Sequence, residues 1–121
     1  MRKIAAPLAL VVAAAALAFT ATGLAAAKAK TLTGTDGPGF TITLKSGSAS
    51  VKKLTAGAYT IVIHDKSNIH NFHLKGPGLN KLTTVSYVGN KTWTVTLKSG
   101  TYKYVCDPHA TSMKGSFKVT A

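Results

Sequence analysis

Three residues near the C-terminus have the chemistry to bind a metal ion together: Cys106, His109 and Met113 place a thiol, an imidazole and a thioether within eight residues. Thiolate and thioether are soft donors, and imidazole is borderline. The set therefore suits copper, because sulfur ligands stabilise Cu(I) and imidazole accepts Cu(II). A trigonal site of two imidazoles and one thiolate, with a weak axial methionine, needs one more histidine.

The segment His70-Asn71-Phe72-His73-Leu74 offers two histidines for that place. In a strand over 70–74, successive side chains point to opposite faces. Phe72 and Leu74 must point to the core, so we expect His70 to point inward with them. Asn71 and His73 then point outward.

Cys106 follows a strand-like run whose two tyrosines, at positions 102 and 104, share its face. His70 begins one strand and Cys106 ends another, and both face inward. If the two strands run antiparallel, these residues meet at one end of the fold. His109 and Met113 then arrive on the loop that caps this end.

The His70-Asn71 pair upstream, and Cys106-Asp107-Pro108-His109 followed by Met113 downstream, make the chain resemble the cupredoxins. These are small blue copper proteins such as plastocyanin, amicyanin and pseudoazurin, and the resemblance covers the chain after about its first thirty residues. It implies one type 1 copper ion bound by His70, Cys106, His109 and Met113. It also implies a one-electron carrier rather than an enzyme. Three residues separate His109 from Met113, where members of the family have two or four.

The resemblance gives roles to the neighbours of these four residues. Asn71 would tie the His70 segment to the Cys106 segment by hydrogen bonds and so hold the ligands in place. Pro108 would stiffen the short link between Cys106 and His109. The exposed edge of His109 would be the port for electrons, inside a small apolar patch for which the candidates are Pro108, Ala110, Pro77 and Leu79.

Other interpretations of the same residues stay open. His73 and His64 are expected to be solvated strand residues, and a second surface metal site that uses them is the alternative. Cysteine with two histidines also occurs at catalytic zinc, although such a site would leave Met113 without a role. The remaining functional alternatives are a copper-binding or delivery protein that uses the same four ligands and a metal-free structural sandwich.

Charge and cysteine content narrow the class of protein. The chain has 121 residues, 15 Lys plus Arg and only 3 acidic residues, and removal of Arg2 and Lys3 with the N-terminal segment lowers the formal net charge from +12 to about +10. Such a surface favours an acidic redox protein or anionic envelope material as partner. The lysines are spread along the chain without a recognition motif, which argues against nucleic acid as the partner.

The lone cysteine excludes a disulfide within one chain. We expect the protein to be a monomer.

The N-terminus predicts export. A basic start is followed by an almost wholly apolar run from Ile4 to Phe19 and by small residues suited to cleavage after Ala27 or Ala29. We therefore expect a signal peptide over residues 1–27 and a copper-binding domain over 28–121, located in the periplasm, the cell envelope or outside the cell. An uncleaved membrane anchor is the alternative, because the apolar stretch approaches the ~20 residues of a membrane span.

From Thr31 onward the hydrophobic pattern has period two and is interrupted by turn residues about every ten positions, which predicts an all-β fold. We expect about eight short strands in a single antiparallel Greek-key β-sandwich. Residues 51–54 are expected to be a connector, 79–83 a loop, and Val85 with Tyr87 a strand. Gly89-Asn90 is a dipeptide typical of hairpin turns.

Overall fold

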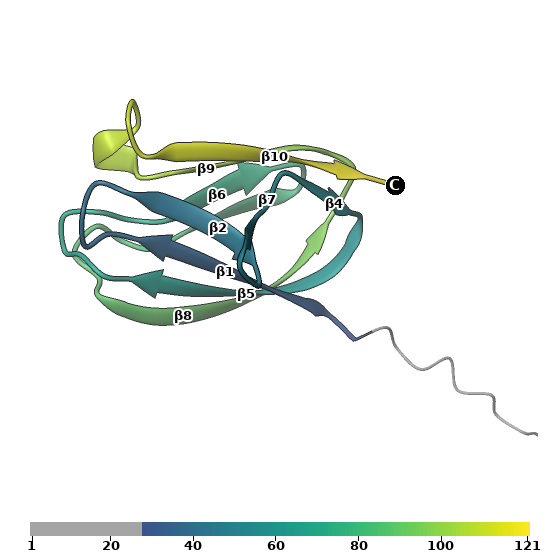
Figure 1. The fold of residues 1–121 in the computed structure, drawn as a ribbon, viewed down its shortest axis with the longest axis horizontal. Coiled ribbons are helices and arrows are strands. Elements are labelled where there is room, and N and C mark those ends of the chain that lie inside the picture. Colours follow the sequence, from purple (N-terminus) through teal and green to yellow (C-terminus); the bar gives the residue numbers. More distant parts are fainter. Residues whose placement is uncertain (1–27) are drawn as a thin grey trace, which may run out of the picture.

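The computed structural model describes residues 28–121, which form two five-stranded β-sheets packed face to face (Figure 1). The expected signal peptide, residues 1–27, lies outside the described residues. The strands are β1 (Lys30–Asp36), β2 (Ile42–Ser46), β3 (Ala49–Ser50), β4 (Lys53–Thr55), β5 (Gly57–Asp65), β6 (His73–Gly76), β7 (Leu79–Leu82), β8 (Gly89–Leu97), β9 (Gly100–Val105) and β10 (Lys114–Thr120), with one 3₁₀ turn, η1 (Asp107–His109). No helix in residues 28–121 is long and apolar enough to cross a membrane.

One sheet has the strand order β3-β2-β1-β5-β8 and the other β4-β10-β9-β6-β7. The all-β sandwich expected from the sequence is confirmed. Most neighbouring strands are antiparallel, but β1 pairs with β5 and β10 pairs with β4 in parallel. These two parallel pairs depart from a purely antiparallel arrangement, because β1 and β4 lie beside strands that are not joined to them by a hairpin.

The alternation of side chains along the strands builds the core between the sheets. The inward residues of both sheets are buried: Leu32, Leu44, Tyr59, Ile61, Ile63, Leu74, Trp93, Val95, Leu97, Tyr102, Tyr104, Phe117 and Val119. Two glycines make room for the tyrosines of β9. A Cβ atom on Gly76 would lie 2.2 Å from the Tyr102 ring, and one on Gly115 would lie 2.2 Å from the Tyr104 ring.

Four segment predictions were wrong in detail. Residues Leu79–Leu82 form strand β7, and part of the expected connector forms β4. Val85 and Tyr87 lie in a turn, where the Tyr87 amide donates to the Thr84 carbonyl at 3.1 Å. Gly89-Asn90 begins β8. Short polar edge strands such as β7 carry little hydrophobic alternation, so the sequence pattern does not separate them from loops.

The register of two strand pairs, β6 with β9 and β1 with β5, sets the position of the candidate site. β6 and β9 are antiparallel, with His73 opposite Val105. The segment before β6 and the segment after β9 therefore meet at one tip of the sandwich, where η1 lies in Figure 1. The loops after β1 and β5 reach the same tip, because these strands are parallel and Asp36 lies opposite Asp65.

Candidate metal centre

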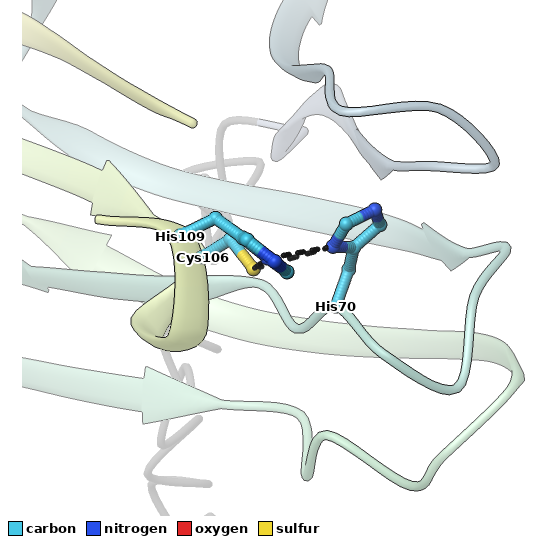
Figure 2. Close-up of side chains that lie close together, drawn as sticks. All are labelled: His70, Cys106 and His109. Atoms are coloured by element: carbon cyan, nitrogen blue, oxygen red, sulfur yellow. Dashed lines mark hydrogen bonds between the residues drawn. The ribbon is translucent and has the colours of Figure 1, made fainter. Parts of the chain in front are cut away.

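Three of the four predicted site residues come together at this tip. Cys106 Sγ lies 3.7 Å from Nδ1 of His70 and 3.5 Å from Nδ1 of His109, and the two Nδ1 atoms are 3.0 Å apart. Figure 2 shows the Cys106 sulfur and the His109 ring, from the segment after β9, directed toward the His70 ring on the loop between β5 and β6. Among residues 28–121, this is the group of histidine, cysteine and acidic residues that could hold a metal ion.

The spacing of these three atoms fits a bound ion. A point equidistant from atoms with these separations lies about 2 Å from each, close to the ~2.0–2.3 Å of metal bonds to histidine nitrogen and cysteine sulfur. His70 and Cys106 are fully buried. The donors are one thiolate sulfur and two imidazole nitrogens, the set that blue copper sites use.

Met113 is also fully buried, and its backbone closes the loop that carries the other two residues. The Cys106 amide donates to the Met113 carbonyl at 3.0 Å, and the Met113 amide donates to the His109 carbonyl at 2.8 Å. Within the same loop, the His109 amide donates to the Cys106 carbonyl at 3.0 Å. Pro108 lies in the first turn of η1. These bonds fix the loop from within.

Asn71 joins the two halves of the site. Its side-chain oxygen accepts from the Asp107 amide at 2.7 Å, and its Nδ2 donates to the Asp107 carboxylate at 2.8 Å and to the Thr83 carbonyl at 3.1 Å. The expected tie between the His70 and Cys106 segments is therefore present. The prediction that Asn71 points outward was wrong: it is buried, because β6 begins only at His73 and strand alternation does not extend to residue 71.

His73 lies outside the cluster, but it is not a freely solvated residue as expected. Its Nδ1 lies 2.9 Å from the Asp107 carboxylate, its Nε2 lies 2.6 Å from Asn80 Oδ1, and 12% of its side chain is exposed. Burial opposes ionisation of Asp107. Its pKa is nevertheless lowered, by hydrogen bonds from Asn71 and His73 and by the charges of His73 and Lys75. His64, the other expected surface histidine, has its Nδ1 2.7 Å from Asn90 Oδ1 on the outer sheet face.

Phe40 is a site residue that the sequence analysis missed. The residue is 62% exposed, and its ring lies edge-on to both imidazoles, with centroids 5.1 Å from His70 and 4.9 Å from His109. It lies in the β1–β2 connection, after the turn Asp36-Gly37-Pro38-Gly39, and an exposed aromatic directly after a turn was the available signal. Phe40 adds an apolar surface at the edge of the half-buried His109.

The expected apolar patch is correct in part. Pro108 and Ala110 are exposed beside His109. Pro77 and Leu79 lie at the opposite end of the sandwich, because β6 runs away from the site and the Pro77 carbonyl accepts from the Tyr102 hydroxyl at 2.9 Å. Phe40, rather than Pro77 or Leu79, completes the apolar patch around His109.

Two buried carboxylates lie where the loops of Phe40 and His70 begin. Asp36 and Asp65 are opposite each other on β1 and β5, with 0% and 2% exposure. Both oxygens of Asp36 and Oδ2 of Asp65 have no hydrogen-bond partner among the described residues. Burial first, and then the neighbouring Asp65 carboxylate, raise the pKa of Asp36 to about 8. The pair therefore holds a proton near neutral pH.

Comparison with solved structures gives the same fold. Reduced rusticyanin matches with a TM-score of 0.56 and 23% identity over 77% of this chain and 81% of that chain. Reduced rusticyanin in solution matches with a TM-score of 0.52 and 22% identity over 77% and 79%. Rusticyanin from Thiobacillus ferrooxidans matches with a TM-score of 0.50 and 21% identity over the same shares. No curated protein matches the chain significantly in sequence.

A family model described as copper binding proteins of the plastocyanin/azurin family matches residues 8–120, which is most of the chain. Copper is the metal of this family, and the cluster of His70, Cys106 and His109 with Met113 matches a type 1 copper site. The chain belongs to the plastocyanin/azurin family of copper-binding proteins.

Proposed function

We propose that the protein is an exported one-electron carrier whose copper ion is held by Nδ1 of His70, Sγ of Cys106, Nδ1 of His109 and the thioether of Met113. The observation that carries this proposal is the convergence of one sulfur and two nitrogen atoms within 4.8 Å of one another in a buried cluster. When bound, copper supplies a one-electron couple between Cu(I) and Cu(II).

The contribution of the chain is to keep the ligands in one arrangement during electron transfer. The hydrogen bonds inside the 106–113 loop and the Asn71–Asp107 bonds hold His109 and Cys106 without help from the metal. Little rearrangement is then needed when an electron arrives or leaves. His109 is the half-buried member of the cluster, and its apolar surroundings of Phe40, Pro108 and Ala110 suit a weak and short-lived redox encounter.

Burial favours electron transfer over copper delivery. His70 and Cys106 are fully buried, so release of the metal would require opening of the hydrogen-bonded loop. Electron transfer requires no such opening.

The proposed export and the proposed acidic partner rest on the sequence. The apolar N-terminal run is typical of a signal peptide. The large excess of lysine over acidic residues favours an acidic donor or acceptor, because opposite charges speed association.

The test of this function is the spectrum and the redox behaviour of the copper-loaded protein. We expect an intense visible absorption band, a type 1 paramagnetic-resonance signal, full loss of both on one-electron reduction and fast electron self-exchange. Rapid transfer of the metal to a chelator, together with slow self-exchange, would support delivery instead. A protein that stays colourless after incubation with copper would be a metal-free sandwich.

The two neighbouring histidines should differ sharply on substitution. His70→Ala removes a nitrogen atom of the cluster, so we expect loss of the type 1 spectrum. His73→Ala removes only a partner of Asp107, so we expect the band to remain and copper affinity to fall by less than about tenfold. His64→Ala is the control for loss of a surface histidine. Bleaching by His73→Ala, with colour retained in His70→Ala, would contradict the assignment.

Met113→Leu should keep the colour and raise the reduction potential. Leucine has a similar volume, so the buried position stays filled at a cost below about 1.5 kcal/mol, while the weak axial donor is lost. Potentiometry of the variant and the wild type, with stability measured on the metal-free forms, tests this expectation. An unchanged or lowered potential would remove Met113 from the ligand set.

A further inference from the structure

The outer face of the β4-β10-β9-β6-β7 sheet carries a hollow of about 610 Å³ that the copper site does not use. Its basic lining residues come from three strands and the segment before β4: Lys52, Lys75, Lys103 and Lys114. A volume of this size is in the range that binds a ligand or a peptide segment.

Strand register gathers these lysines on one face. Lys75 on β6 lies directly opposite Lys103 on β9, and Lys103 lies opposite Ser116 on β10. Lys114 precedes Ser116 by two residues and so shares its face. Like charges placed directly opposite each other are unfavourable unless an anion relieves them.

One carboxylate lies among these four lysines. Asp107 lines the hollow, is held by Asn71 and His73, and has its pKa lowered in part by the charge of Lys75, so the lining keeps an excess of positive charge. The other two acidic residues of the chain, Asp36 and Asp65, are buried in the opposite sheet.

The opposite sheet provides a contrast. On the outer face of that sheet, strand alternation places one lysine, Lys45 on β2, opposite Thr33. The outward positions of β1, β5 and β8 carry no lysine and are rich in threonine: Thr31, Thr33, Thr35, Thr60, Thr92, Thr94 and Thr96. The positive charge on the lysine face is therefore more than a reflection of the overall composition. It marks one side of the sandwich.

The hollow also touches the chain on both sides of Cys106. Val105 and Asp107 are among its lining residues, and Ala110 connects it to the loop that carries His109. A group bound there lies next to the metal-binding segment rather than at the far end of the molecule.

Resting on the electron-carrier function proposed above, we propose that this lysine hollow docks a carboxylate-rich segment on the surface of the protein's redox partner. Arginine, with its planar fork, favours tight bidentate recognition of phosphate, but the described residues contain none. Lysines on flexible stems, spread over a sheet face, instead provide a salt-sensitive attraction to carboxylates, which suits a transient complex.

The test is a titration of the isotope-labelled protein with an octaglutamate peptide at low salt, in metal-free and copper-loaded forms. We expect the amide signals of Lys75, 103–105 and 114–116 to shift most. We also expect Lys75→Glu combined with Lys103→Glu to weaken peptide binding about tenfold or more. The matched control, Lys45→Glu with Lys91→Glu, carries the same net charge and should change binding less than about twofold. Both hollow lysines are exposed, and Lys75→Gln with Lys103→Gln should give an intermediate loss without charge reversal.

Equal losses in the two charge-reversed variants would overturn the docking site, because net charge alone would then explain binding. Signal shifts centred elsewhere would also overturn it. Tripolyphosphate that binds the hollow, where octaglutamate does not, would replace the protein partner with a phosphate ligand and contradict the proposal. If the blue protein fails to bind the peptide, the docking site is contradicted and the electron carrier is not. If a protein that stays colourless binds the peptide, the electron carrier and its redox partner are contradicted, and the hollow is a binding site for acidic segments of another kind of partner.

Discussion

Cys106→Ala should abolish the intense visible absorption of the copper-loaded protein completely. The Cys106 sulfur lies within 3.7 Å of both Nδ1 atoms, and it is the one thiolate that this chain can offer to an ion. The colour of a blue copper site depends on the thiolate bond to the metal, so no other residue can replace it. Absorption spectra of wild type and variant at equal copper loading measure the effect.

The control for this variant is the stability of the metal-free protein. Cys106 is a small, buried, free thiol, and its replacement by alanine removes only one atom from the tip of the sandwich. We expect the metal-free variant to remain folded, with a loss of about 1 kcal/mol in unfolding free energy. A folded Cys106→Ala protein that still turns blue would disprove the assignment of the thiolate.

Asp36→Asn should stabilise the fold near neutral pH. The folded-state pKa of Asp36 is raised from 3.8 to about 8, first by burial and then by the Asp65 carboxylate. The unfolded chain therefore releases this proton at lower pH than the folded chain, and the unfolding free energy falls as pH rises from about 4 to about 8. Asparagine carries no charge at any of these pH values. We expect a gain of up to about 4 kcal/mol at pH 7 that shrinks toward zero near pH 4.

Denaturant unfolding of the metal-free protein, followed by fluorescence of the buried Trp93, measures this difference across the pH range. Asp65→Asn is the matched variant and should act in the same direction, because the two carboxylates lie opposite each other and share the burial. A gain that does not vary with pH, or a loss of stability at pH 7, would show that the pair is not held protonated.

The sequence predicted the sandwich because its longest strands alternate strictly. Tyr59, Ile61 and Ile63 on β5, and Trp93, Val95 and Leu97 on β8, all face the core as expected. The parallel pairing of β1 with β5 could not be read from alternation, because a period of two defines faces but not neighbours. Short strands are held by backbone pairing, β4 to the longer β10 and β7 to β6, and their side chains carry little signal.

The candidate site, like the fold, could be predicted from the sequence only in part. The types and spacing of Cys106, His109 and Met113 were sufficient to predict a metal-binding loop, and His70 lies inside as predicted. The reason given for His70 was only partly right, because this residue precedes β6 and reaches the interior from a loop. The contacts of Phe40 with the imidazoles, and of Asp107 with His73, join residues thirty or more positions apart. Such contacts depend on how the loops close over the tip, which local pattern does not specify.

The central claim is that one copper ion is bound by His70, Cys106, His109 and Met113 at the tip of the sandwich. A crystal structure of the copper-loaded protein, with anomalous scattering recorded at the copper edge, tests it most directly. We expect a single strong peak bonded to Sγ of Cys106 and to Nδ1 of both histidines, with the Met113 sulfur as the more distant fourth ligand. A peak at His64 or His73, with the Cys106 sulfur left unbound, would contradict the claim.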